Sequence, residues 1–323
     1  MDALSDVFAA VRLSGGVFLD AAFTAPWCVE SQVGPEEFPQ GEMPAHLIAY
    51  HYVVAGRMFV QVGGEAVDVA AGEIVMLPRN DGHLLASAPG LRPTPIDPHL
   101  QAPDAGTPAS LRLGGGGEHT RIVCGFLGCE APHNPLVATL PPVLKLGVRD
   151  GTGGDWIESS FRHAAEEFAA GGIGSAAVLG KLAELLFVEA VRRYLANLPA
   201  GHTGWLAGLQ DRTVGRALAL LHSRVAHPWT TEELARAVGL SRSAFAERFT
   251  ALLGTPPMHY LANWRLQLAA LRLRDSPAAT AQIAFDIGYD SEAAFCRAFK
   301  RAYGTTPAAW RRQGGIMIGR GDT

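Results

Sequence analysis

The feature that most constrains this chain is a unit repeated in its last third. "VGLSRSAFAERFTALLGTPPMHY" spans residues 238–260, and "IGYDSEAAFCRAFKRAYGTTPAAW" spans residues 287–310. In both copies a glycine turn precedes a serine, two phenylalanines follow four residues apart, and Gly-x-x-Pro closes the unit. Serine favours the first position of a helix, and residues four apart share one helix face. Each copy therefore predicts a short helix, a tight turn and a second helix with one face free to project.

This arrangement is helix-turn-helix geometry, in which the second helix enters the DNA major groove. Residues 205–313 resemble the DNA-binding domain of the AraC/XylS family of bacterial transcription regulators, most clearly in "IAFDIGYDSEAAFCRAFKRAYGTTP" at 283–307. The resemblance implies a double helix-turn-helix domain over 205–314, joined by a long helix at 257–275. It also implies that one monomer reads two successive grooves of double-stranded DNA, about 34 Å apart. RNA polymerase is an expected partner, and an activator is the expected role.

The predicted reading faces lie opposite the phenylalanines of the two second helices. Arg297 is predicted to contact guanine, and Glu247 to accept from a cytosine amino group. Ser291, Lys300 and Arg301 are predicted to contact phosphates. The alternative for each arginine is a solvated surface charge. The predicted DNA-contacting residues are Arg242, Ser243, Ala246, Glu247, Arg248, Ser291, Glu292, Ala293, Cys296, Arg297, Lys300 and Arg301.

The charge distribution supports a DNA-binding second half. Residues 1–204 hold 12 Lys and Arg against 22 Asp and Glu, a net charge of −10, whereas residues 205–323 hold 15 against 9, a net charge of +6. A basic half joined to an acidic half indicates that only the basic half meets a polyanion. No apolar run of eighteen residues occurs and the start is acidic rather than basic. We therefore expect no membrane contact and a cytoplasmic protein.

The first half, roughly residues 15–130, has the pattern of short β-strands. Residues 58–62 alternate, Gly63-Gly64 is a hairpin signal, and "GEIVMLP" is a further strand that ends at Pro78. Residues 119–130 predict another strand. The Pro- and Gly-rich segment 88–118 predicts a mobile loop. Together with the helices, these strands predict an α+β chain with an N-terminal β-barrel.

"GEIVMLPRNDGHLL" is similar to the second cupin motif, giving Gly72, Pro78 and His83, and His51 stands where a first-motif histidine would fall. The resemblance implies a cupin-like sensor domain over residues 1–150 that responds to an effector: a small molecule, a metal or an oxidant. The acidic ligand position of the first motif is filled by residues such as Arg57 and Met58. That gap argues against the alternative function, a metal-dependent cupin enzyme fused to a helical domain. We expect no enzyme activity.

Three interpretations of His51, His83, Cys124 and Cys129 stay open. The first is structural, with hydrogen-bonded histidines and buried thiols. The second is a metal site, suited to zinc by ligand type. The third is a redox sensor that pairs Cys124 with Cys129, or uses Cys28. Five positions along an unbroken strand place Cys124 and Cys129 on opposite faces, which weakens that pairing.

Residues 155–198 change to a helical period, with a broad apolar face that includes Leu179, Leu186 and Val191. That face either packs on the β domain or forms a homodimer interface, and we treat 151–204 as a linker and dimerisation segment. Residues 206–227 predict one long helix that stops at Pro228. Residues 315–323 are predicted to be a tail.

Overall fold

The computed structural model describes residues 3–11, 13–35, 38, 43–44, 46–101, 109–129, 135–147, 154–199 and 201–315. The chain divides into two compact units. The β-rich unit comprises Arg12–Pro132 and Leu140–Ala196, and the helical unit comprises Met1–Val11, His133–Thr139 and Asn197–Thr323. The α+β class is confirmed. The boundaries predicted at 150, 204 and 314 stay predictions, and the tail beyond residue 315 lies outside the described residues.

The β-rich unit contains two sheets. The seven-stranded sheet has the strand order β11-β6-β3-β10-β1-β9-β8, and the four-stranded sheet has the order β2-β7-β4-β5. Most neighbours are antiparallel, while β1 and β9 pair in parallel. The strands are β1 (Ser14–Thr24), β2 (Cys28–Ser31), β3 (His46–Ala55), β4 (Arg57–Val62), β5 (Glu65–Ala70), β6 (Glu73–Leu77), β7 (His83–Ala86), β8 (Leu100–Gln101), β9 (Ala109–Gly114), β10 (His119–Cys129) and β11 (Leu144–Gly147).

The core of this unit lies between the two sheets. It is formed mainly by aliphatic and aromatic side chains from both sheets, among them Phe23, Val53, Met58, Val60 and Ile122. Alternation along the strands produces this arrangement, since every second residue of a half-buried strand points to one face. The core also contains the thiol of Cys124, which is 2% exposed.

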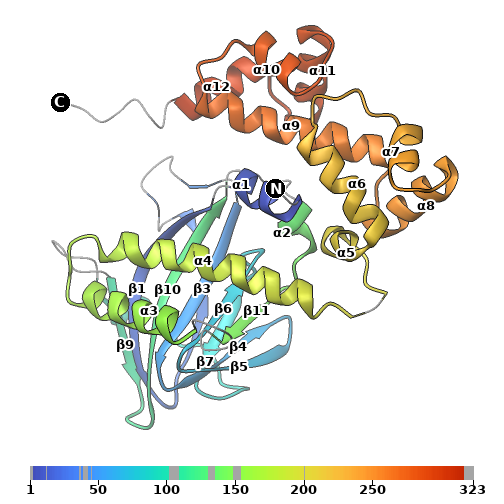
Figure 1. The fold of residues 1–323 in the computed structure, drawn as a ribbon. Coiled ribbons are helices and arrows are strands. Elements are labelled where there is room, and N and C mark those ends of the chain that lie inside the picture. The colour runs from blue at the N-terminus through green and yellow to red at the C-terminus, as the bar shows by residue number, and fades with distance from the viewer. Residues whose placement is uncertain are drawn as a thin grey trace. The chain divides into compact units, whose positions relative to one another are not determined.

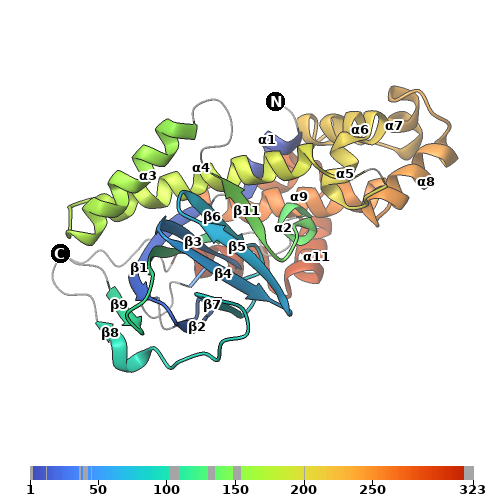
Figure 2. The same ribbon diagram turned by 90° about the horizontal axis from the view of Figure 1, so that it is seen from below.

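Two helices, α3 (Gly154–Ala169) and α4 (Ser175–Ala196), cover the seven-stranded sheet, as Figures 1 and 2 show. The close approach of α4 to β1 requires glycine on both sides. A Cβ atom built on Gly15 would lie 2.2 Å from the carbonyl oxygen of Gly180. The carboxylate of Glu184 then accepts a hydrogen bond from the Gly15 amide at 2.9 Å. The broad apolar face of the second predicted helix is therefore largely core of this unit.

The segment predicted to be a mobile loop, 88–118, contains regular structure. A short 3-10 helix, η2 (Asp97–His99), leads into β8, and β9 pairs with β1 along six positions. Residues 102–108 of the predicted loop lie outside the described residues. The loop prediction was wrong for residues 109–114, which form the strand "ASLRLG". The alternation in this segment is short, and the Pro and Gly residues on both sides of it favour a loop.

The helical unit contains α1 (Ala3–Val11), α2 (Pro135–Thr139), α5 (Trp205–Gln210), α6 (Arg212–Ser223), α7 (Thr231–Ala237), α8 (Arg242–Leu253), α9 (Pro257–Asp275), α10 (Thr280–Asp286), α11 (Glu292–Tyr303) and α12 (Pro307–Gly315). The single helix predicted over 206–227 is two helices. Asp211 separates them because its carboxylate caps α6, accepting from the amides of Thr213 and Val214. No helix in the described ranges is long and apolar enough to cross a membrane.

Candidate nucleic-acid interface and sensor site

The first helix-turn-helix unit is formed by α7, a turn at Gly239 and α8. Gly239 has φ of +79°, a conformation that favours glycine. Ser241 caps α8, since its hydroxyl accepts from the Ala244 amide at 3.3 Å. Phe245 and Phe249 are fully buried. The predicted turn, cap and core residues of this unit are thus confirmed.

The second unit repeats this construction with α10, a turn at Gly288 and α11. Ser291 caps α11 through the Ala294 amide at 3.2 Å. Phe295 and Phe299 are fully buried, and they belong to one apolar cluster with residues of α9 and α10. Both second helices end at a glycine in the left-handed conformation. The two units therefore present equivalent second helices from one continuous framework.

Most of the predicted DNA-contacting residues lie on the solvent side of α8 and α11. The exposed members are Arg242, Ser243, Glu247, Arg248, Ser291, Glu292, Ala293, Arg297, Lys300 and Arg301. Ala246 and Cys296 are half-buried. Cys296 packs against the apolar cluster of the second unit, where burial raises the pKa of its thiol. Its expected orientation away from the phenylalanines is thus only partly met.

The exposed cations of α8 and α11 differ in how they are paired. Arg248 donates to the carboxylate of Asp211, with Nε 3.0 Å from Oδ2, so its guanidinium is already engaged. Among the described residues, Arg242, Arg297, Lys300 and Arg301 form no ion pair. Unpaired cations on one helix face are the groups that neutralise DNA phosphates.

Arg265 lies on the connecting helix α9 and joins the two helix-turn-helix units. The sequence alone does not predict this role. Its guanidinium donates to three backbone carbonyls: Val225 at 2.8 Å, His227 at 2.8 Å and Gly288 at 3.0 Å. The first two carbonyls precede α7, and the third is the turn of the second unit. Half-burial lowers the pKa of Arg265 by desolvation. This side chain therefore links the segment before α7 to the turn of the second helix-turn-helix unit.

The turn at Gly288 allows this contact. Its φ is +87°, and an added Cβ would lie 2.6 Å from Arg265 Nη2 and 2.7 Å from the Ala226 carbonyl oxygen. A glycine turn is an expected helix-turn-helix feature, but its packing against Arg265 depends on tertiary structure. The same helix also carries Arg272 and Arg274, so the sequence does not distinguish Arg265 from them.

A second polar group lies beneath the first unit. His222 stacks on Trp264 with ring centroids 4.2 Å apart, and its Nε2 atom lies 2.8 Å from the hydroxyl of Tyr260. That hydroxyl also accepts from Trp205 Nε1 at 2.7 Å. It can therefore donate to His222, which is neutral. Burial lowers the pKa of His222 to about 4.

In the β-rich unit, His51, His83 and Cys124 form a chain of hydrogen bonds across the core. His51 and Cys124 are directly paired on β3 and β10, while His83 begins β7 of the other sheet. The distance from Cys124 Sγ to His51 Nδ1 is 3.0 Å, and the two histidine Nε2 atoms are 2.7 Å apart. The chain thus connects the two sheets through their interior.

The hydrogen bond between His83 and the Asp81 carbonyl fixes the direction of the other two. His83 Nδ1 lies 2.8 Å from the carbonyl oxygen of Asp81, which can only accept, so Nδ1 carries the hydrogen. A neutral His83 then accepts at Nε2 from His51, and His51 Nδ1 accepts from the Cys124 thiol. Burial lowers the pKa of both histidines and raises that of Cys124. All three groups are therefore neutral and mutually satisfied.

This geometry does not fit a zinc site. With zinc–nitrogen bonds of about 2.05 Å, Nε2 atoms 2.7 Å apart would subtend an angle of about 82°, far below the tetrahedral value. Cys124 contacts the other nitrogen of the His51 ring, away from the point where the two Nε2 atoms meet. No group of three or more metal-ligating side chains is found in the described part of the chain.

The cysteines do not fit a disulfide within β10. Cys124 and Cys129 are both buried on β10, and neither forms a disulfide bond in the described part of the chain. Five steps along a strand separate Cα atoms by about 17 Å, whereas a disulfide needs less than about 7 Å. Cys28 lies on β2 of the other sheet and is also free.

The fold and these sites define a helix-turn-helix DNA-binding protein with an attached β-rich domain of two sheets. A family model described as Cupin matches residues 2–196, and one described as Helix-turn-helix domain matches residues 234–313. A putative AraC-like transcription regulator of Streptomyces antibioticus is 31% identical over 97% of this chain and 99% of its own length. The chain therefore belongs to the AraC-like transcription regulators with an N-terminal cupin domain.

Two further relatives extend this comparison. The HTH-type transcriptional regulator AlkR of Acinetobacter baylyi is 27% identical over 97% of this chain and all of its own. The RCS-specific HTH-type transcriptional activator RclR of Escherichia coli is 25% identical over 97% of this chain and 98% of its own. Both matches cover nearly the full length of proteins that are named as transcriptional regulators.

Proposed function

We propose that this regulator binds a specific double-stranded DNA operator with α8 and α11 in successive major grooves. The observation that carries this proposal is the pair of equivalent second helices, whose two helix-turn-helix units are linked through Arg265. Exposed side chains on both helices and four unpaired cations support it. Two rigidly connected readers bind with less loss of freedom than two independent ones.

Individual residues take the roles that their positions favour. Arg297 contacts a guanine edge, where its planar fork can make two hydrogen bonds. Ser291, Lys300 and Arg301 contact phosphates, and Arg242 and Ser243 do so at the start of α8. Glu247 and Glu292 are acceptors for cytosine amino groups. Three of the remaining proposed contacts have small side chains and act as spacers: Ala246, Ala293 and Cys296. The fourth, Arg248, is already paired with Asp211.

The regulator acts as a homodimer through the outer face of α3 and α4. Val178, Leu182 and Leu185 are spaced as i, i+4 and i+7 on α4; Val178 is 49% exposed and Leu185 44%. Trp156 on α3 is 66% exposed. Exposed apolar residues in this pattern form helix–helix seams. A dimer would place four helix-turn-helix units on one operator.

The cupin domain responds to an effector, and that response changes how the helical unit presents its readers. The chain passes from one compact unit to the other near residues 12, 133, 140 and 197. A conformational change in the cupin domain can therefore displace the helical unit through four chain connections. We favour an organic effector over zinc or an oxidant, because His51, His83 and Cys124 form a satisfied neutral chain. The same incomplete metal set disfavours the alternative of a cupin enzyme.

We further propose that the protein is a cytoplasmic activator that contacts RNA polymerase. The Escherichia coli relative, named a transcriptional activator, supports the role. A reporter assay distinguishes activation from repression, which the same DNA contacts could also produce. Activation requires transcription above the level measured without the regulator.

The test is selection of an operator from random DNA by the full chain, followed by titration of variants. Arg297→Ala is expected to weaken operator binding about 10- to 100-fold and to relax choice at one base pair. Arg112→Ala, at an exposed arginine of β9, removes the same charge from the β-rich unit and is the control. Binding should also weaken steeply with salt, by about 0.9 in log–log slope per neutralised phosphate. Equal affinities of the two variants would refute the groove assignment.

A further inference from the structure

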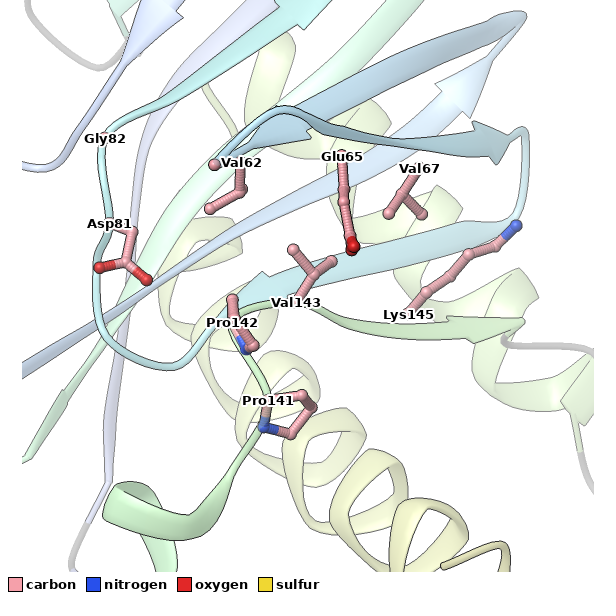
Figure 3. Close-up of a pocket in the computed structure, with 10 residues that line it drawn as sticks. Val62, Glu65, Val67, Asp81, Gly82, Pro141, Pro142, Val143 and Lys145 are labelled. Atoms are coloured by element: carbon pink, nitrogen blue, oxygen red, sulfur yellow. The ribbon is translucent and has the colours of Figure 1, made fainter. Parts of the chain in front are cut away.

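The β-rich unit has a pocket of about 850 Å³ at one edge of its two sheets (Figure 3). Its walls come from the β4–β5 hairpin, from the segment that precedes β7, and from the start of β11. The volume lies within the range of small-molecule sites in proteins. All the residues that line it belong to one unit, so the pocket does not depend on how the two units are arranged.

The walls of this pocket are mainly apolar. Val62, Val67 and Val143 line it, and the same three side chains pack against the core between the sheets. Each is only partly buried, so apolar surface that the core leaves uncovered faces the pocket. Figure 3 shows these side chains around the opening, with Pro142 beside Val143. Such a surface favours a ligand with an apolar body.

The charged groups at the pocket favour a cation. The carboxylates of Glu65 and Asp81 accept no hydrogen bond and form no ion pair with the described residues. The one basic lining residue, Lys145, is already neutralised, since its Nζ lies 2.8 Å from Glu73 Oε2 and donates to the Asp68 carbonyl at 2.8 Å. Two unpaired carboxylates beside apolar walls attract a positive group and repel an anion.

We propose that this pocket binds a small organic cation with an apolar body, of the arylalkylamine class. The carboxylates of Glu65 and Asp81 attract the ammonium group, and the apolar part covers Val62, Val67 and Val143. An ammonium group is charged at neutral pH, because its pKa is near 10. The proposal rests on the proposed function only in calling this ligand the effector.

The pocket is connected to the buried chain of hydrogen bonds. Asp81 lines the pocket, and its carbonyl oxygen accepts from His83, which bonds His51 and, through it, Cys124. A ligand that moves Asp81 changes the position of the carbonyl that anchors this chain. The chain crosses from one sheet to the other, so a local change at the pocket alters how the two sheets are joined.

The experiment measures binding of three matched probes to the full chain by calorimetry: 4-phenylbutylamine, 4-phenylbutanoate and 4-phenylbutan-1-ol. We expect the amine to bind at least tenfold more tightly than the alcohol, and the carboxylate more weakly than both. The double variant Glu65→Gln/Asp81→Asn should lose the preference for the amine. Glu30→Gln, which removes an exposed carboxylate of β2, is the control and should keep it.

The outcomes separate this proposal from the proposed function. Equal binding of amine and alcohol, or a preference unchanged in the double variant, overturns the cation site. Operator binding is measured on the same proteins with and without the amine. If the amine binds as expected but operator binding never occurs, the site stands and the proposed function fails. If it binds without altering operator binding, the site stands and its role as effector site is refuted.

Discussion

Replacing Arg265 with methionine tests whether the two helix-turn-helix units are held as one body. Methionine keeps an unbranched, partly apolar side chain but removes the charged donor of three carbonyls. A hydrogen bond to a charged group contributes about 1.5–3 kcal/mol, and water can reach this half-buried site and replace part of each one. We therefore expect a loss of about 3 kcal/mol, at about 1 kcal/mol per carbonyl.

The assay is urea unfolding followed by tryptophan fluorescence. Four of the six tryptophans, Trp205, Trp229, Trp264 and Trp310, lie in the helical unit, so the signal reports mainly on that unit. A loss of about 3 kcal/mol lowers the urea midpoint by about 1–3 M. Operator binding should weaken at least tenfold, since the readers lose their fixed spacing.

Two variants control this prediction. Arg272→Met removes a cation from the same helix, where Arg272 pairs with Asp286 at 3.4 Å with both side chains 43% exposed. An exposed pair contributes about 0–1 kcal/mol, so the midpoint should hardly move. Arg265→Lys keeps the charge but lacks the planar fork, and should stay impaired. If Arg265→Met is no less stable than Arg272→Met, the three hydrogen bonds of Arg265 do not hold the two helix-turn-helix units together.

Two other predictions concern stability and assembly. Because the pKa of His222 is lowered to about 4 from its ordinary 6.5, the unfolded state binds a proton over this window that the folded state does not. Stability should fall by about 3 kcal/mol as the pH drops from about 6.5 to about 4. His222→Gln should flatten this dependence in fluorescence-detected unfolding, and an unchanged slope would contradict it. Val178→Glu/Leu185→Glu should give monomers in light scattering, whereas the exposed control Glu166→Gln should not; a dimer in both would exclude this face.

The helix-turn-helix units could be predicted from the sequence because their signals are local. A serine cap, phenylalanines four apart and a closing glycine act within a few residues, and both copies are confirmed. The break at Asp211 was missed although its signal is local too, since an aspartate can cap a helix inside an apolar pattern. The apolar positions continue at helical spacing on both sides of Asp211, so the periodicity alone does not show the break.

The long-range features could not be predicted in the same way. The parallel pairing of β9 with β1 joins segments about ninety residues apart, and no pattern within β9 specifies its partner. The contacts of Arg265 go to backbone carbonyls, which every residue has, so the sequence does not mark them. The motif placed His51 and His83 in one domain, but only their 2.7 Å separation distinguishes a hydrogen bond from a metal site.

We propose above that one chain reads two adjacent grooves of its operator. Hydroxyl-radical footprinting of the full chain on its selected operator tests this most directly. We expect two protected patches per monomer on one side of the duplex, about one helical turn apart, and loss of the patch at α11 in Arg297→Ala. A single patch per monomer, or two patches on opposite sides of the duplex, would contradict it.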